Sequence, residues 1–323
     1  MTARPLLRLA AALLAALLTA CAGAPERSLA WREAWDLVAF GDDGVLIDAR
    51  LERGNTGLLR GQGQLSMVVF PPHDSPVILR RTAAPGTVAF SAEAGDLRVA
   101  QDRLERRAGA WMLQVREGAE FLDAALQLVP EVAELPPATL VEGRRQWLVG
   151  APVPAGSVAG AWRAGEAGGL LRGRGMLVRQ SSDTWPGRAH PEGALTLANP
   201  RCLLAVRRVG DAALAWLYAD GELRWARSVS IRRTGHRIEL SLEPELAVTA
   251  SVELARRRVL LEAWSQLIAL ERPLARLAFG TPDRAFERGT AELVVDGARE
   301  RSTALLVGRE LPQVPHRERR AAR

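Results

Sequence analysis

The sequence predicts an all-β protein made of two antiparallel β units in tandem, with one or two short helices. Apolar and polar residues alternate in several segments, as in strands with one dry and one solvated face. Asp-Gly dipeptides separate such segments, and one short stretch recurs further along the chain. The 323 residues suit about two domains, and an apolar content of 48% excludes a disordered chain.

Strands are predicted where alternation is clearest, in residues 45–51, 111–116 and 238–243. Two hairpins are predicted around Asp220-Gly221 and Asp296-Gly297, because Asp-Gly supplies the positive φ angles of a type I′ turn. Residues 31–40 are expected to form a short helix. Residues 256–270 have roughly helical spacing of apolar residues before Pro273, although a pair of strands fits them equally.

An internal echo indicates that the fold is doubled. The segment from Gly57 to Leu65 returns as Gly169 to Leu177 with seven of nine positions identical, and a second echo has nearly the same offset. We therefore expect a first β domain over residues 31–145 and a second over residues 146–315. A basic tail follows at residues 316–323.

The first residues indicate a membrane anchor. Arg4 and Arg8 precede ten alanines and leucines, a run too short to cross a bilayer but typical of a secretory signal. Leu18-Thr19-Ala20-Cys21 then resembles a bacterial lipobox, which implies a signal peptide over residues 1–20 and acyl chains such as palmitate on Cys21. An ordinary cleaved signal is the alternative. Residues 21–30 would be a tether, and the expected location is the cell envelope, on the outer membrane facing the periplasm.

The charge pattern excludes nucleic acid as a partner. The sequence contains no lysine, so its 43 cationic side chains are arginines, and they are interleaved with 37 acids. A phosphate-binding surface would need them gathered on one stripe.

Motifs for metals and cofactors are missing from the sequence. His73, His190, His236 and His316 are never at metal-ligand spacing, and without lysine there is no phosphate loop, so we expect neither group. Cys202 lies in an apolar run and is expected to be a buried structural cysteine rather than a nucleophile.

Four segments carry a resemblance to a known family. They are the opening Phe40-Gly41-Asp42-Asp43-Gly44, the stretch 88–104, the Gly-x-Gly at Gly173 to Gly175, and the closing segment 289–293. Together they resemble the two-domain lipocalin-like family that includes AttH-type proteins and the carotenoid hydratases (hydroxyneurosporene synthases). The resemblance implies two tandem lipocalin-like β-barrels and hydrophobic ligands, and its members include hydratases and cyclising or isomerising enzymes.

The candidate site residues follow from this resemblance and from composition. The histidine- and aspartate-rich segment of hydratases is reduced here to Asp183, Trp185 and His190, so Asp183 and His190 are the candidates for an acid–base pair. A solvated loop is the alternative. The candidates to line an apolar cavity, with core packing as the alternative, are Trp111, Trp147, Trp162 and Trp225.

The sequence thus predicts a lipoprotein that binds or presents a lipid or isoprenoid in a lipocalin-like cavity, rather than an enzyme. One alternative is a hydratase, isomerase or cyclase acting on a polyene in that cavity. Another is an envelope assembly lipoprotein that binds no ligand. The expected partners are the membrane through Cys21, an apolar small molecule and envelope proteins.

Overall fold

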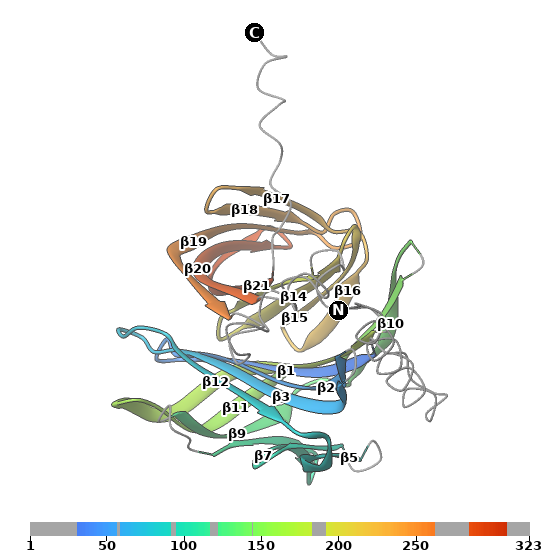
Figure 1. Ribbon diagram of the computed structural model, residues 1–323. Helices are drawn as coiled ribbons and strands as arrows, with labels where there is room; N and C mark the ends of the chain where they lie inside the picture. The colour runs from blue at the N-terminus through green and yellow to red at the C-terminus, as the bar shows by residue number, and fades with distance from the viewer. Residues whose placement is uncertain are drawn as a thin grey trace, which may run out of the picture.

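The computed structural model describes residues 31–56, 59–91, 95–116, 122–143, 145–182, 192–261 and 284–308, which are nearly all in antiparallel strands (Figure 1). The expected signal peptide, Cys21, the tether, Asp183, His190 and the basic tail lie outside these residues. Within the described ranges, no helix has the length and apolar character needed to cross a membrane.

Two sheets contain all the strands. The twelve-stranded first sheet consists of β1 (Arg32–Gly41), β2 (Leu46–Thr56), β3 (Leu59–Phe70), β4 (Val77–Ala83), β5 (Val88–Ser91), β6 (Asp96–Val99), β7 (Asp102–Arg107), β8 (Ala110–Val115), β9 (Leu122–Pro130), β10 (Leu135–Glu142), β11 (Arg145–Ala164) and β12 (Ala167–Ser182). The nine-stranded second sheet consists of β13 (Glu192–Ala198), β14 (Cys202–Val209), β15 (Ala212–Ala219), β16 (Glu222–Ala226), β17 (Ser230–Thr234), β18 (Arg237–Ser241), β19 (Val248–Leu261), β20 (Arg284–Val295) and β21 (Ala298–Gly308).

Both sheets have the same topology. The first strand of each pairs with its last, β1 with β12 and β13 with β21, and the other strands follow as meanders on either side. The strand order is β4-β3-β2-β1-β12-β11-β9-β8-β7-β6-β5 in the first sheet, where β10 pairs with β11 outside this path, and β16-β15-β14-β13-β21-β20-β19-β18-β17 in the second. The first sheet curls into a nearly closed barrel and the second into a half-barrel (Figure 1). The predicted tandem, all-β, lipocalin-like architecture is confirmed.

The two sheets divide later than residues 145 and 146, where we expected the boundary. Strands β11 and β12 pair with β9 and β1, so the change of sheet comes between Ser182 and Glu192. The two copies of the sequence echo also do not lie in equivalent strands of the two sheets. Its two copies lie in β3 and β12 of the same sheet, whereas the shared topology makes β15 the counterpart of β3.

The helix expected at residues 31–40 is wrong, and for residues 256–270 the strand alternative holds over the described part. Residues 32–40 belong to strand β1, and residues 256–261 belong to β19, while 262–270 lie outside the described residues. β1 was misread because both of its faces are buried. Trp35 and Leu37 point into the barrel and Val38 and Phe40 point toward the second sheet, so no solvated face marks the period.

The turn predictions are confirmed at both Asp-Gly sites. Asp220 and Gly221 have φ angles of 51° and 82°, and Asp296 and Gly297 have 49° and 86°. They connect β15 to β16 and β20 to β21, as a type I′ turn requires.

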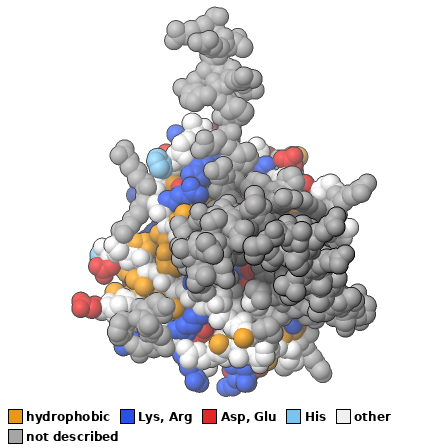
Figure 2. All heavy atoms as spheres, viewed as in Figure 1, with side chains coloured by type: hydrophobic (Ala, Val, Ile, Leu, Met, Phe, Trp, Pro, Cys, Tyr) orange, Lys and Arg blue, Asp and Glu red, His pale blue; other side chains and the backbone are white. Residues whose placement is uncertain are grey.

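Three apolar cores stack along the molecule. One fills the first barrel, one lines the second sheet, and the third lies between them with side chains from both sheets. In this middle core, Trp216 of β15 is fully buried and its Nε1 donates to the Pro154 carbonyl of β11 at 3.0 Å. The first sheet therefore has an apolar layer on each face. On the surface drawn in Figure 2, cationic and acidic side chains both lie around exposed hydrophobic ones at the left of the view.

The Gly-x-Gly motif has a packing role in β12. A Cβ on Gly173 would collide with the Phe40 carbonyl oxygen of neighbouring β1, and one on Gly175 would lie 2.8 Å from the Val38 oxygen. The same strand carries Gly169, where a Cβ would meet nothing within 4 Å.

We expect Gly173→Ala to lower the free energy of unfolding by about 1–3 kcal/mol, because β1 and β12 must move apart. Gly169→Ala is the matched control and should be neutral or slightly stabilising. Urea denaturation followed by far-UV circular dichroism measures both. Equal stabilities of the two variants would contradict the packing role.

Candidate functional site

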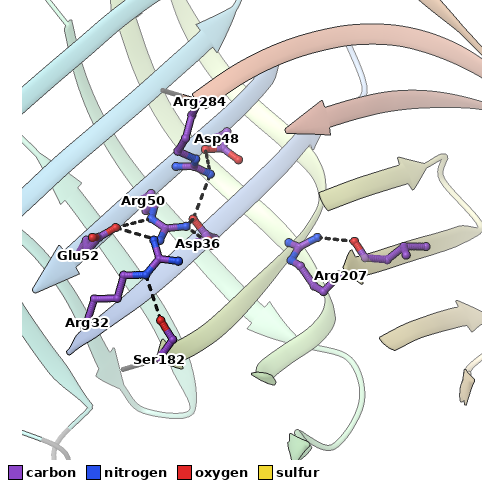
Figure 3. Close-up of polar contacts among 9 residues, drawn as sticks. Arg32, Asp36, Asp48, Arg50, Glu52, Ser182, Arg207 and Arg284 are labelled. Atoms are coloured by element: carbon purple, nitrogen blue, oxygen red, sulfur yellow. Dashed lines mark hydrogen bonds and ion pairs between the residues drawn. The ribbon is translucent and has the colours of Figure 1, made fainter. Parts of the chain in front are cut away.

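A group of charged side chains lies where the second sheet covers the first; Asp36, Asp48, Arg50 and Arg207 are buried, and Arg32, Glu52 and Arg284 are partly exposed. We call it the inter-sheet cluster, and its members are Arg32, Asp36, Asp48, Arg50, Glu52, Arg207 and Arg284 (Figure 3). β1 and β2 supply the first five on the face that also carries Val38 and Leu46. Arg207 comes from β14 and Arg284 from β20 of the second sheet. Strand alternation thus places these charges inside an otherwise apolar core.

Arg50 is the best-paired member of the cluster. It lies opposite Asp36 in the β1–β2 register, and its Nη1 donates to the two Asp36 oxygens at 3.3 and 3.4 Å. Its Nε donates to Glu52 at 2.9 Å. Burial opposes ionisation, but the surrounding arginines, Arg50 first, hold the pKa of Asp36 below its usual range. Asp36 is therefore a permanent anion that anchors Arg50.

Arg284 of the second sheet contacts two carboxylates of the first sheet, but at longer distances than those between Arg50 and its partners. Its Nη2 lies 3.5 Å from Oδ1 of Asp36 and 3.8 Å from Oδ1 of Asp48. Nη1 of Arg284 and Oδ1 of Asp48 are both buried and have no hydrogen-bond partner among the described residues. Buried polar atoms are nearly always hydrogen-bonded, so this donor and acceptor mark a polar gap.

Asp48 differs sharply from Asp36. Burial, opposed by Arg284 and reinforced by the nearby Asp36, raises the pKa of Asp48 to about 6. The Asp48 side chain is only 3% exposed. It is an acid that can hold or release a proton near neutral pH.

Arg207 faces the first sheet from β14 without an acidic partner. Its Nη1 donates to the Val206 carbonyl at 3.2 Å, and its guanidinium lies 5.7 Å from the centre of the Trp216 ring. In the described part of the chain, no carboxylate lies within ion-pair distance of it. Burial lowers the pKa of Arg207 to about 10, which leaves it positively charged at neutral pH.

A cleft of about 860 Å³ lies between the sheets further along β1. The first sheet lines it with Phe40, Gly41 and Arg174, and the second with Asn199 and Thr303, among others. Phe40 is four residues from Asp36, roughly 13 Å along an extended strand. None of the residues that line the cleft belongs to the cluster, and Phe40, which also belongs to the middle core, is the cleft residue on the same face of β1.

The predicted cavity tryptophans are not brought together. Trp111 and Trp162 point into the first barrel, and Trp147 lies in the core between the sheets. Trp225 is 53% exposed on edge strand β16. Trp111 also contacts Trp35 across the barrel, with ring centres 5.3 Å apart. Asp183 and His190 lie outside the described residues.

Cys202 is buried, as expected. Burial and the adjacent Glu300, whose carboxylate lies 3.6 Å from the sulfur, raise the pKa of Cys202 to about 12. The thiol is therefore a poor nucleophile. The described side chains contain no group of three or more potential ligands arranged to hold a metal ion.

Sequence reasoning missed the inter-sheet cluster. It placed Asp48 and Arg50 on the solvated face of their strand, but the second sheet covers that face and buries both. One signal was available. Asp36 interrupts an apolar run from Ala34 to Phe40, and a charge inside a doubly buried strand needs a partner.

Comparisons with solved structures support the fold. No known family model and no curated protein matches the sequence. An AttH-type protein from Nitrosomonas europaea superposes with a TM-score of 0.60 at 13% identity, covering 88% of this chain and 98% of that one. CghA gives 0.58 at 11%, covering 90% of each chain. Kievitone hydratase from Nectria haematococca gives 0.58 at 7%, covering 86% and 88%. The chain has the two-barrel fold of these AttH- and hydratase-type proteins.

The two buried aspartates should respond oppositely to neutralisation. Asp36→Asn removes the partner of Arg50 and should lower the free energy of unfolding by about 2–4 kcal/mol at pH 7.5. Asp48→Asn removes a poorly compensated anion and should raise it by on the order of 1–3 kcal/mol. Urea denaturation measures both values.

The sign of the pH effect provides a check. The pKa of Asp48 lies above its ordinary value of 3.8. The loss of folding stability caused by its buried negative charge is therefore fully present above about pH 6 and disappears toward pH 4. The gain from Asp48→Asn should therefore shrink at pH 5. The charged groups that face Asp48 are Asp36 and Arg50 of the first sheet and Arg207 and Arg284 of the second. Equal losses from the two substitutions would show that both carboxylates are needed as anions.

Proposed function

We propose that the protein binds an apolar molecule with a polar end between its two sheets. The observation that carries this proposal is the pair of buried, unsatisfied atoms, Nη1 of Arg284 and Oδ1 of Asp48, at the centre of an apolar core. A ligand hydroxyl, carbonyl or acid group would satisfy both. Its hydrocarbon part would pack against the middle core, as in most small-molecule sites.

The position between the sheets fits better than the barrel interior. The side chains that face the inside of the first sheet pack against one another, and the contact of Trp35 with Trp111 crosses the barrel. The middle core is instead adjacent to the cleft at Phe40, which gives a route from solvent. A ligand entering there would meet Asp48 and Arg284 at its inner end.

Structurally similar proteins support a small organic ligand. One structure of CghA contains Sch210972, and another protein of this fold is a kievitone hydratase. The identities of 12% and 7% connect these proteins to this chain through the fold alone.

We further propose that the protein is an envelope lipoprotein. The lipobox-like sequence ending at Cys21 supports lipid attachment at that residue and location on the outer membrane facing the periplasm. A lipid anchor would hold the site close to a bilayer. An apolar ligand could then move between membrane and protein without crossing bulk water.

Retinol and retinoic acid test the binding proposal, because they share one apolar skeleton with different polar ends. The full chain carrying Cys21→Ser, titrated with each, should show saturable quenching of tryptophan fluorescence, because both retinoids absorb at the tryptophan emission wavelength. Arg284→Met should weaken binding of the better ligand about tenfold by removing a buried donor. The control Arg299→Met changes an arginine that is 77% exposed on the same sheet and should have no effect. If neither retinoid bound, or if Arg284→Met bound both normally, the proposed site would be wrong.

Asp48 also supports a second candidate function, the hydration, isomerisation or cyclisation of a polyene. With a pKa of about 6, its carboxyl can donate a proton to an alkene carbon near neutral pH. The resulting cation would be quenched by water, by proton loss or by an internal double bond. The carboxylate would regain a proton from the water or carbon that loses one.

The catalytic candidate predicts that product formation from a bound polyene falls as pH rises through about 6. At saturating polyene, where a change in affinity does not count, Asp48→Asn should reduce the rate at least 100-fold, an effect on the scale of general acid catalysis. Product analysis by mass spectrometry after incubation provides the measurement. Turnover that survives this substitution would remove Asp48 from the chemistry.

A further inference from the structure

The inter-sheet cluster contains more positive than negative charge. Four arginines, Arg32, Arg50, Arg207 and Arg284, face three carboxylates, Asp36, Asp48 and Glu52. Among the described residues, the cluster therefore has one positive charge in excess when every group is ionised. Protonation of Asp48 raises the excess to two. A buried charge without a partner is costly, so the cluster favours an added anion.

The excess charge is located at Arg207. Arg50 has the carboxylate partners Asp36 and Glu52, and Arg284 lies near Asp36 and Asp48, whereas the one hydrogen bond of Arg207 among the described residues goes to the neighbouring Val206 carbonyl. A guanidinium has five N–H donors in a fixed plane that matches a carboxylate or phosphate. Burial limits the residue to 5% exposure, so water does little to compensate its charge.

The surroundings of Arg207 suit the neck of an amphiphile. Val209 and Leu214 are its neighbours on the same face of the second sheet, and both belong to the middle core. The Trp216 ring holds the guanidinium from one side. Across the interface are Asp36 and Asp48, which act on Arg207 electrostatically without contacting it (Figure 3). The apolar chain of such a ligand could pack against Val209 and Leu214, and its charged end could bind the adjacent Arg207.

We propose that the natural ligand is an amphiphile with an anionic head, a carboxylate or phosphate, and that Arg207 binds this head together with Arg284. This inference rests on the proposed binding site between the sheets and specifies what the site selects. A neutral alcohol of the same skeleton leaves the excess charge uncompensated and binds more weakly. The head leaves the pairs of Arg50 with Asp36 and Glu52 in place and competes only with the longer contacts of Arg284 to Asp36 and Asp48.

The comparison of retinoic acid with retinol tests the inference on the intact Cys21→Ser chain. Retinoic acid should bind at least about tenfold more tightly, as expected for a charge-assisted pair with buried arginine. Arg207→Met should reduce this ratio to near one while leaving retinol affinity unchanged. Arg207→Lys should retain part of the preference, and the exposed control Arg299→Met all of it. Displacement by hexadecanoate and by hexadecyl phosphate identifies which anion is favoured.

A second measurement needs no substitution at Arg207 and holds if that variant fails to fold. Hexadecyl sulfonate keeps its charge at all relevant pH values, so its affinity should rise as pH falls from 7.5 to 5 and Asp48 becomes neutral. The charged groups around Asp48 that set this dependence are Asp36 and Arg50 of the first sheet and Arg207 and Arg284 of the second. Equal affinity for retinol and retinoic acid, or sulfonate binding independent of pH, would overturn the anionic head and leave the binding site standing. Failure of both retinoids to bind would overturn the binding site itself.

Discussion

Burial of both faces of β1, β2 and β12 is the constraint on which the rest of the structure depends. Inside the barrel these strands contribute Trp35, Leu37 and Leu177, and on the outer face they contribute Val38, Leu46 and Met176. A strand with two dry faces is normal in a parallel sheet covered by helices. Here an antiparallel sheet is covered by a second sheet of the same topology. Any charged residue on the outer face must therefore find its partners within the interface.

The inter-sheet cluster meets that requirement only in part. Arg50 joins Asp36 and Glu52 within the first sheet, and this pairing would exist without the second. Contacts across the sheets are longer, 3.5 and 3.8 Å from Arg284, and Arg207 makes none with a described carboxylate. Burying such charges contributes little net stability compared with apolar residues of similar size. Apolar contacts and the Trp216–Pro154 hydrogen bond join the sheets independently of these charges. A binding role explains the charges better than a stabilising one.

The fold was predictable from sequence because its signals are local. Alternation in residues 111–116 and 238–243 and the two Asp-Gly turns depend on neighbouring residues, and each was located correctly. The helix expected at residues 31–40 was wrong because burial on both faces removed the period-two signal from β1. The site was missed for a related reason. Alternation alone places Asp48 and Arg50 on an outer face, and only the docking of a sheet more than 140 residues away in sequence shows that this face is buried. The structural repeat consists of the shared strand order of the two sheets. The sequence echo does not reflect it, because its two copies fall in non-equivalent strands.

Asp36 and Asp48 show how position assigns different tasks to the same side chain. Both carboxylates are buried on the same face of adjacent strands, and both are near Arg284. Asp36 also lies directly opposite Arg50, and this one extra partner keeps it ionised. Asp48 lies opposite Val38 instead, so desolvation dominates and its pKa rises to about 6. Two acids with pKa values pushed apart can divide the work, one as a fixed anion that orients the arginines and the other as a proton carrier. The proton and the excess positive charge then lie together at the inner end of one apolar site. That arrangement suits an acidic amphiphile as ligand, and it also provides the acid that a polyene-transforming enzyme would need.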